Sequence, residues 1–305
     1  MPSHDTSLRP FRDSTDLLGS GELLRRRADE DGYLFFRQLL PRADVERVRR
    51  AISEVLVTEG SLVDAESGAV DRAHVDAIPA DLMRQDIGIS ESAYVAVQRV
   101  QDMHRLPHHP ALLALYRDLF DDEVFVHPRH IVRAMTGHPA LRPTPAHQDF
   151  PLIQGTQNTW TAWFPLADTP LERGPLSVLR GSHRQGYIPI APAEGAGLIE
   201  AILCDEDDWV GGAFEAGDVL TFPSLLVHRA VPASARDTIR LSLDIRFQPV
   251  SEPVEERSLS NHSDHSWEEI YEGWQVQDVQ YYWRDDAPAL SPWNDELLQP
   301  GRRIC

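Results

Sequence analysis

A histidine and an aspartate two residues apart, His147-Gln148-Asp149, are the first residues of this sequence whose types and spacing suggest chemistry. On a β-strand, residues i and i+2 point to the same face, so this imidazole and this carboxylate can hold one side of a metal ion. A second histidine from elsewhere in the chain would complete a 2-His-1-carboxylate facial triad, the ligand set of non-haem Fe(II) oxygenases. We therefore predict that His147 and Asp149 form part of a metal site.

The same His-x-Asp pattern also occurs at His74-Val75-Asp76 and at His262-Ser263-Asp264, so its context must decide. The stretch around His74 is polar and has no strand pattern, and His262 is expected to lie in a solvated turn before a capped helix. Only His147 has β-like runs on both sides and a distal histidine, His228, within one of them. We predict that His228 is the third ligand.

An arginine on the next β-like run follows His228 by twelve residues. Arg240, Ser242, Asp244 and Arg246 share one face of that run, because side chains alternate along a strand. A guanidinium with a hydroxyl two residues on suits a carboxylate, since arginine binds two carboxylate oxygens at once. Arg240 and Ser242 are thus a candidate carboxylate clamp, whereas Arg246 is expected to make surface salt bridges.

Short β-like runs must position these residues, and each is bounded by Gly, Pro or Asp turn signals. The runs cover 124–135, 158–168, 174–182, 218–231 and 237–250. Strands in series without βαβ alternation are typical of a sandwich or jelly roll. Residues 42–57 and 108–120 have helical apolar spacing. We expect a mainly β fold with flanking helices.

We expect one domain over residues 1–305, with a mainly helical part (1–122), a β core (123–250) and a C-terminal extension (251–305) packed on the core. The extension holds four of the seven tryptophans, and Ser266 with Glu269 can form a capping box there. Long segments without regular structure often cover active sites. The segment 58–90 and the extension are therefore expected to border the mouth of the barrel.

The composition limits the class of protein. There are 29 Lys and Arg against 48 Asp and Glu, giving a formal net charge of −19. This balance argues against binding to nucleic acid or to an anionic membrane, both of which need basic surfaces. No apolar run approaches a membrane span and the start has no signal-peptide pattern, so we expect a cytoplasmic protein. Cys204 and Cys305 are far apart and are expected to form no disulfide framework.

The stretch PAHQDFPLIQGTQNTWTAWFPLADTPLERGPLSVLRGSH, followed by GDVLTFPSLLVHRAVP and TIRLSL, resembles the phytanoyl-CoA dioxygenase family. The resemblance covers about residues 94–248. Members are Fe(II)- and 2-oxoglutarate-dependent oxygenases on a double-stranded β-helix, a jelly roll of cupin-like type. It implies that His147, Asp149 and His228 hold iron, and that Arg240 binds the C5 carboxylate of 2-oxoglutarate. The other 2-oxoglutarate contacts that it implies are Ser242, Trp163, Arg99 and Arg129.

The resemblance implies that the protein uses O2 to hydroxylate an unactivated C–H bond of a small molecule, with release of succinate and CO2. The substrate class would be a natural-product, amino-acid or lipid-derived intermediate. The intact Asp149 argues against halogenation, because related halogenases have a small residue there. Desaturation, epimerisation and ring closure stay open.

Two other classes of protein compete with the oxygenase. A cupin-like metal-binding protein without oxygenase activity would keep the triad but would need no carboxylate clamp, so Arg240 and Ser242 argue against it. A zinc hydrolase is less favoured because the ligand spacing is not the helical HExxH type. The net negative charge would steer a cationic substrate toward the protein, although solubility explains the charge equally well.

Overall fold

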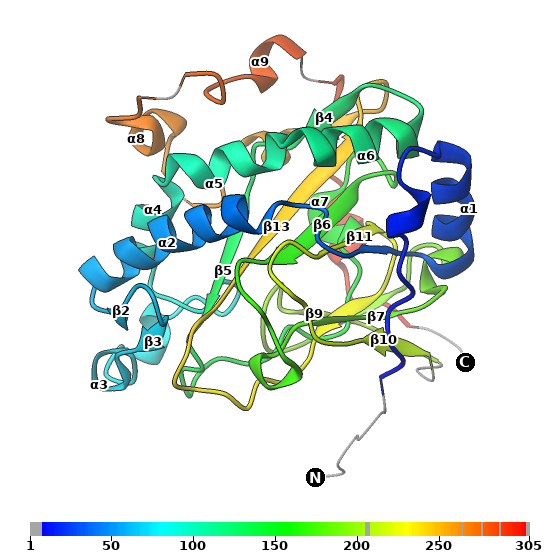
Figure 1. Ribbon diagram of the computed structural model, residues 1–305. Coiled ribbons are helices and arrows are strands. Elements are labelled where there is room, and N and C mark those ends of the chain that lie inside the picture. Colours follow the sequence, from blue (N-terminus) through cyan, green and yellow to red (C-terminus); the bar gives the residue numbers. More distant parts are fainter. Residues whose placement is uncertain (1–7, 205–207, 264, 276, 287, 303–305) are drawn as a thin grey trace.

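The computed structural model describes residues 8–204, 208–263, 265–275, 277–286 and 288–302. A six-stranded antiparallel sheet lies at its centre (Figure 1). The strands follow the order β1 (Leu34–Phe36), β11 (Val219–Pro223), β6 (Trp160–Pro165), β13 (Arg240–Pro249) and β4 (Val124–Val126), with β5 (Ile131–Met135) also paired to β13.

A smaller sheet has the order β10 (Trp209–Gly211), β7 (Leu176–Leu179) and β12 (His228–Ala230). One apolar cluster joins the two sheets, with Trp163 and Leu220 from the large sheet and Val178 and Val210 from the small one. The two facing sheets confirm the predicted jelly roll. Three two-stranded ribbons complete the strands: β2 (Leu62–Asp64) with β3 (Ala69–Val70), β8 (Ile190–Pro192) with β9 (Ile199–Ala201), and β14 (Val254–Glu255) with β15 (Leu290–Ser291).

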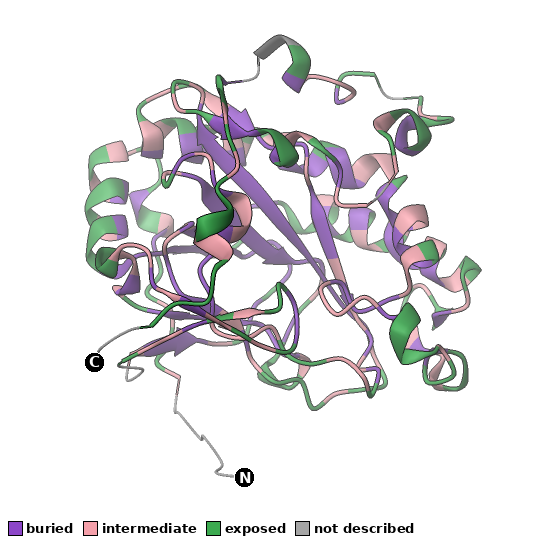
Figure 2. Cartoon of the chain, turned by 180° about the vertical axis from the view of Figure 1, so that it is seen from behind, coloured by how far each residue is buried: buried purple, intermediate pink, exposed green. Residues whose placement is uncertain are grey.

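Helices cover the outer face of the large sheet (Figure 1). They are α1 (Gly21–Asp31), α2 (Arg42–Thr58), α4 (Glu91–Gln98), α5 (Gln101–Arg105) and α6 (Pro110–Phe120). The predicted apolar face of α2, which includes Val48 and Ile52, is buried in the apolar core that α2 shares with this sheet. Helix α6 starts with Pro110, whose missing N–H costs nothing in a first turn. Figure 2 shows the strands buried and the helices exposed on their outer sides.

The remaining helical elements are short. They are α3 (Arg72–Val75), α7 (Phe150–Ile153), α8 (Trp267–Tyr271) and α9 (Trp283–Asp286), with 3-10 turns at Thr15–Leu17, Ala80–Leu82, Leu106–His108, Leu171–Arg173, Ser182–Gln185, Glu256–Leu259 and Asp295–Leu298. None of the helices in the described ranges is long and apolar enough to cross a membrane.

Two of the expected strands are broken. The run 124–135 divides into β4 and β5, because the chain bends at Pro128, which has no N–H for a sheet ladder. The run 218–231 divides at a turn after Pro223, where the N–H of Leu226 bonds to the Pro223 carbonyl. This turn places β11 in the large sheet and β12, with His228, in the small one.

Strand β13 has the two faces that alternation predicts. Leu241, Leu243, Ile245 and Phe247 belong to the core beneath the helices. The face with Arg240 and Arg246 points the other way, yet all ten residues of the strand are buried. The expectation of a surface position for Arg246 is wrong, because the interior of the jelly roll covers this second face.

The C-terminal extension packs its aromatic residues against β4. Phe125 shares an apolar cluster with Ile270, Tyr271 and Trp283, and the Tyr282 hydroxyl donates to the Val126 carbonyl at 3.0 Å. The capping box predicted at Ser266 is present at the start of α8.

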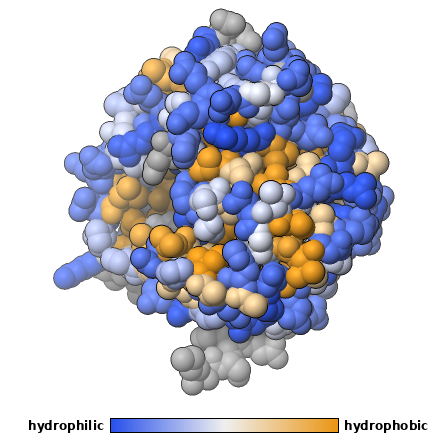
Figure 3. Space-filling view, turned by 90° about the vertical axis from the view of Figure 1, so that its left-hand side faces the viewer, coloured by the Kyte–Doolittle hydropathy of each residue, from blue (hydrophilic) through white to orange (hydrophobic). Residues whose placement is uncertain are grey.

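The surface around this fold is mostly hydrophilic, as the net charge predicts, although Figure 3 shows apolar side chains gathered toward the middle of one face. Cys204 is disulfide-bonded, so the expectation of no disulfide is wrong there. Cys305 lies outside the described residues.

Candidate active site

The three predicted metal ligands meet between the two sheets. His147 and His228 form an antiparallel bridge in which each backbone N–H bonds to the other's carbonyl at 3.0 Å. The sequence suggested that Asp149 lies on a strand. In the structure it is instead the residue before the short helix α7. The backbone bridge and the helix start together bring the imidazoles and the carboxylate to one point.

The ligand atoms lie close enough to share one ion. Asp149 Oδ1 is 3.6 Å from His147 Nε2 and 3.8 Å from His228 Nε2. One ligand atom from each of the three residues lies within 4.8 Å of the others, and all three residues are buried. This is the arrangement of a facial triad.

Hydrogen bonds fix the orientation of both imidazoles. His147 Nδ1 is 2.9 Å from the Pro145 carbonyl, and His228 Nδ1 is 3.2 Å from the Leu226 carbonyl. Because a carbonyl only accepts, each Nδ1 carries the proton and each Nε2 presents a lone pair. Burial, with the neighbouring His147, lowers the pKa of His228 to about 4, so its ring is neutral at pH 7. The donor set therefore fits a divalent metal such as Fe(II).

The second oxygen of Asp149 has two partners that sequence reasoning missed. Oδ2 accepts a hydrogen bond from Thr161 Oγ1 at 2.6 Å and lies 3.4 Å from the Arg246 guanidinium. Burial alone would raise the pKa of Asp149, but Arg246 and the two histidines outweigh it and hold the pKa well below its usual value. No local sequence signal pointed to these partners, because Thr161 on β6 meets Arg246 on β13 only through the register of the sheet.

Arg240 is a buried cation without an anionic partner. Its NH1 group donates to Ser242 Oγ at 2.7 Å, and no carboxylate lies within 4 Å of it in the described part of the chain. Arg240 Nε and Trp163 Nε1 are both buried, and neither has a hydrogen-bond partner among the described residues. Burial, with the charge of Arg133, lowers the pKa of Arg240 to about 10. Since a buried unpaired charge is costly, these free donors fit a carboxylate ligand such as that of 2-oxoglutarate.

Two cavities lie around these residues. His147 and Asp149 line one of about 320 Å³, and Arg240 lines another of about 250 Å³. The wall of the first cavity includes Asp86 from the segment 58–90 and Glu255, Arg257, Ser258, His262 and Trp293 from the C-terminal extension. Both segments therefore border the site, as expected.

The other residues predicted to contact 2-oxoglutarate lie at different distances from Arg240 and the triad. Trp163 is fully buried on β6, with the Arg240 guanidinium carbon 5.8 Å from its ring centre. Arg129 lies between β4 and β5 and lines the cavity of the triad rather than that of Arg240. Arg99 ends α4 with a side chain that is 44% exposed and 4.0 Å from Glu272, and it lines neither cavity. The structure does not bring Arg99 to the site.

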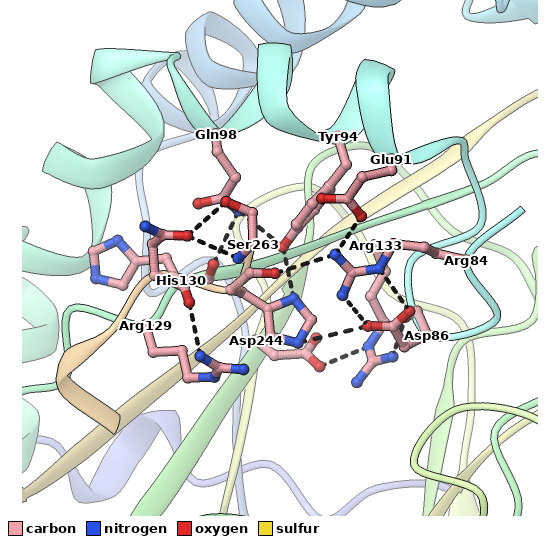
Figure 4. Close-up of polar contacts among 12 residues, drawn as sticks. Arg84, Asp86, Glu91, Tyr94, Gln98, Arg129, His130, Arg133, Asp244 and Ser263 are labelled. Atoms are coloured by element: carbon pink, nitrogen blue, oxygen red, sulfur yellow. Dashed lines mark hydrogen bonds and ion pairs between the residues drawn. The ribbon is translucent and has the colours of Figure 1, made fainter. Parts of the chain in front are cut away.

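His262 lies in a different environment from the one expected. It is mostly shielded from solvent, with Nδ1 2.9 Å from the Tyr94 hydroxyl and Nε2 3.6 Å from Asp86, two residues that Figure 4 labels. The solvated turn predicted there is wrong, because the C-terminal extension folds back over α4. His262 therefore forms part of the cavity wall.

Comparison with known proteins agrees with this geometry. Residues 28–240 match the family described as phytanoyl-CoA dioxygenase. The chain belongs to the phytanoyl-CoA dioxygenase family. This membership confirms the predicted enzyme class, a non-haem iron dioxygenase with 2-oxoglutarate as co-substrate, and disfavours the two rival classes.

Individual relatives cover most of the chain. A 1-deoxypentalenic acid 11-beta-hydroxylase of Streptomyces arenae is 28% identical over 255 residues, which are 79% of this chain and 86% of the relative. The epimerase SnoN, solved with Fe3+, alpha ketoglutarate and nogalamycin RO, has a TM-score of 0.53 at 21% identity over 77% of this chain and 85% of its own. The carbocyclase SnoK from nogalamycin biosynthesis has a TM-score of 0.53 at 21% identity over 80% of this chain and 89% of its own. The two solved structures share the jelly-roll fold with this dioxygenase.

Proposed function

We propose that this dioxygenase hydroxylates an unactivated C–H bond of a small natural-product molecule, using O2 and 2-oxoglutarate and releasing succinate and CO2. The observation that carries the proposal is the buried triad of His147, Asp149 and His228, whose three free ligand atoms face one point beside a cavity. The intact carboxylate and the hydroxylase names of the relatives support hydroxylation. Iron, when bound, supplies the oxidising chemistry.

The residues around the triad have separable tasks in this proposal. His147 and His228 present Nε2 and Asp149 presents Oδ1, while Thr161 and Arg246 hold Oδ2 away from the metal position. The three-residue ligand set leaves positions open for 2-oxoglutarate and O2.

Arg240 and Ser242 bind the C5 carboxylate of 2-oxoglutarate, and Trp163 forms the wall beside them. The guanidinium is already positioned by its hydrogen bond to Ser242, so little side-chain entropy is lost on binding. The buried surroundings exclude water and strengthen this ion pair.

The substrate occupies the cavity of about 320 Å³, a volume within the usual range for small-molecule sites. Ile131, Leu152 and Ile153 offer apolar surface there, next to His147 and Asp149. This wall holds an apolar body close to the metal position and limits the access of water.

An anaerobic titration tests the proposal. Addition of 2-oxoglutarate to the Fe(II) protein should produce a weak visible charge-transfer band, and a panel of small molecules screened for succinate release should then reveal the substrate class. Mass analysis of the product separates the outcomes, because hydroxylation adds one oxygen, desaturation and ring closure remove two hydrogens, and epimerisation leaves the mass unchanged. Iron binding without the charge-transfer band would contradict the proposal.

A further inference from the structure

The cavity of the triad is rich in arginine although the molecule as a whole is strongly acidic. Four arginines line it: Arg129, Arg133, Arg246 and Arg257. Two of them are neutralised within the protein, because Arg133 pairs with Asp244 at 2.7 Å and Arg246 with Asp149 at 3.4 Å. Arg129 and Arg257 are left without an acidic partner within 4 Å in the ranges that the structure describes.

Arg129 is the more deeply placed of these two cations. It is partly buried, whereas Arg257 is exposed and stacks its guanidinium 4.0 Å over the ring of Trp293. Within the described ranges one hydrogen bond holds Arg129, which Figure 4 labels, from its NH1 group to the Asn261 carbonyl at 2.7 Å. A guanidinium has five N–H donors, so Arg129, which lines the cavity, keeps donors available for a ligand there.

Among the described residues no acidic side chain lies within 4 Å of Arg129, although Asp86 and Glu255 attract it from a greater distance. Asp86 is paired with Arg84 at 2.7 Å and lies 3.6 Å from His262. Glu255 lines the same cavity, but its Oε2 accepts the backbone N–H of Arg257, and burial raises its pKa. A desolvated guanidinium without a counterion is a costly feature unless a ligand supplies the anion.

The co-substrate does not account for Arg129. The free donors for 2-oxoglutarate belong to Arg240 and Trp163, and Arg240 lines the other cavity. No described residue lines both cavities. The sequence-based assignment of Arg129 to 2-oxoglutarate is therefore less consistent with the structure than a contact to the substrate.

We propose that the substrate is a carboxylic acid whose carboxylate binds Arg129, with its apolar body held against Ile131, Leu152 and Ile153. This inference rests on the proposed function and names the substrate class of that site. The planar guanidinium can donate hydrogen bonds to both carboxylate oxygens, which fixes the orientation of the molecule as well as its position. The local charge thus selects an anion, whereas the net charge of the protein would favour a cation.

Calorimetric titration of matched probes tests this inference. The probes are 1-adamantanecarboxylate and 1-deoxypentalenic acid, each compared with its neutral methyl ester, added anaerobically to the protein loaded with Fe(II) and 2-oxoglutarate. At least one acid should bind about tenfold to a hundredfold more tightly than its ester, the range for a hydrogen-bonded charge pair. The substitution Arg129→Gln should remove this preference, and Arg129→Lys should restore part of it.

Two controls separate the causes of failure. Arg117→Gln removes the same charge from a surface ion pair with Glu123 and should leave the acid preference unchanged. The charge-transfer band of the Fe(II) and 2-oxoglutarate complex should persist in Arg129→Gln. Absence of any acid preference, including absence of binding by every probe, or a preference that survives Arg129→Gln, would overturn the inference. A missing band in the wild-type protein would instead overturn the proposed function.

Discussion

The two oxygens of Asp149 have different surroundings, and this difference assigns them different tasks. Oδ1 lies 3.6 and 3.8 Å from the ligand nitrogens of the two histidines. Oδ2 is held by the Thr161 hydroxyl and lies beside the Arg246 guanidinium. An outer partner of this kind helps to keep a carboxylate ionised and correctly oriented, and this supports metal affinity.

Replacement of Arg246 by methionine should therefore weaken iron binding. The variant keeps a long side chain but removes the charge that opposes the effect of burial, so the pKa of Asp149 should rise. We expect a loss of about tenfold to a hundredfold in Fe(II) affinity, measured by anaerobic metal titration at pH 7. Arg246→Lys should lose less, and an unchanged affinity in Arg246→Met would show that the ion pair does not support the metal site.

Arg240 should affect the co-substrate and not the metal. Arg240→Ala is expected to keep its iron content and to raise the apparent KM for 2-oxoglutarate by on the order of a hundredfold or more, because one side of a buried charge pair is lost. Arg240→Lys should recover part of this loss. A larger rise in the KM for 2-oxoglutarate in Arg246→Ala than in Arg240→Ala would show that the assignment of the carboxylate clamp to Arg240 is wrong.

At the scale of elements, strand β13 carries both the co-substrate clamp and the partner of Asp149. Its alternation was readable from the sequence, since Arg240 and Arg246 are six residues apart on one face. The burial of that face was not readable, because it depends on the small sheet and on the C-terminal extension. Local spacing likewise indicated His147 and Asp149, whereas the distant His228 was indicated by its place in a β-like run.

Contacts between segments that are distant in the chain could not be predicted from the sequence. His262 contacts Tyr94, from which it is separated by 168 positions of the chain, and no local pattern around either residue predicts this contact. Arg99 shows the opposite error, because its motif suggested the site while the end of α4 directs the side chain toward Glu272 and solvent. Side-chain direction at a helix end depends on tertiary packing, which one sequence does not reveal.

His262 links the C-terminal extension to α4, so its removal should loosen the cavity wall. His262→Ala loses the contacts to Tyr94 and Asp86, and the unfolding free energy should fall by about 1–3 kcal/mol. Limited proteolysis should cut the extension sooner, while iron content stays unchanged. His265→Ala is the matched control, because its ring is partly exposed and lies 3.5 Å from Glu269 on the surface. Equal proteolysis rates in the two variants would contradict this role.

At the scale of the whole molecule, buried neutral histidines make stability depend on pH. Burial lowers the pKa of His104 to about 4 and that of His127 to about 3. The unfolded chain binds these protons near its ordinary value of about 6.5. Between these values the unfolded state holds more protons, so acidification favours unfolding.

The free energy of unfolding should accordingly fall by about 2 kcal/mol for each such histidine between pH 7 and pH 5. Urea denaturation at the two pH values measures this change. In His104→Gln, whose amide can still donate to the Gln98 carbonyl, the free energy of unfolding should change less between the two pH values. The difference from the wild-type protein should be about the contribution of one histidine. A free energy of unfolding that is constant over this range would mean that the histidines are accessible to protons in the folded state.

The separation of the two cavities affects the order in which reactants bind and products are released. A co-substrate anchored at Arg240 and a substrate anchored at Arg129 approach the triad along walls that share no described residue. Succinate can then dissociate while the oxidised product is still bound, and neither product has to leave before the other. Product-inhibition kinetics should show succinate competing with 2-oxoglutarate but not with the substrate. Competition with both would mean that the two routes merge.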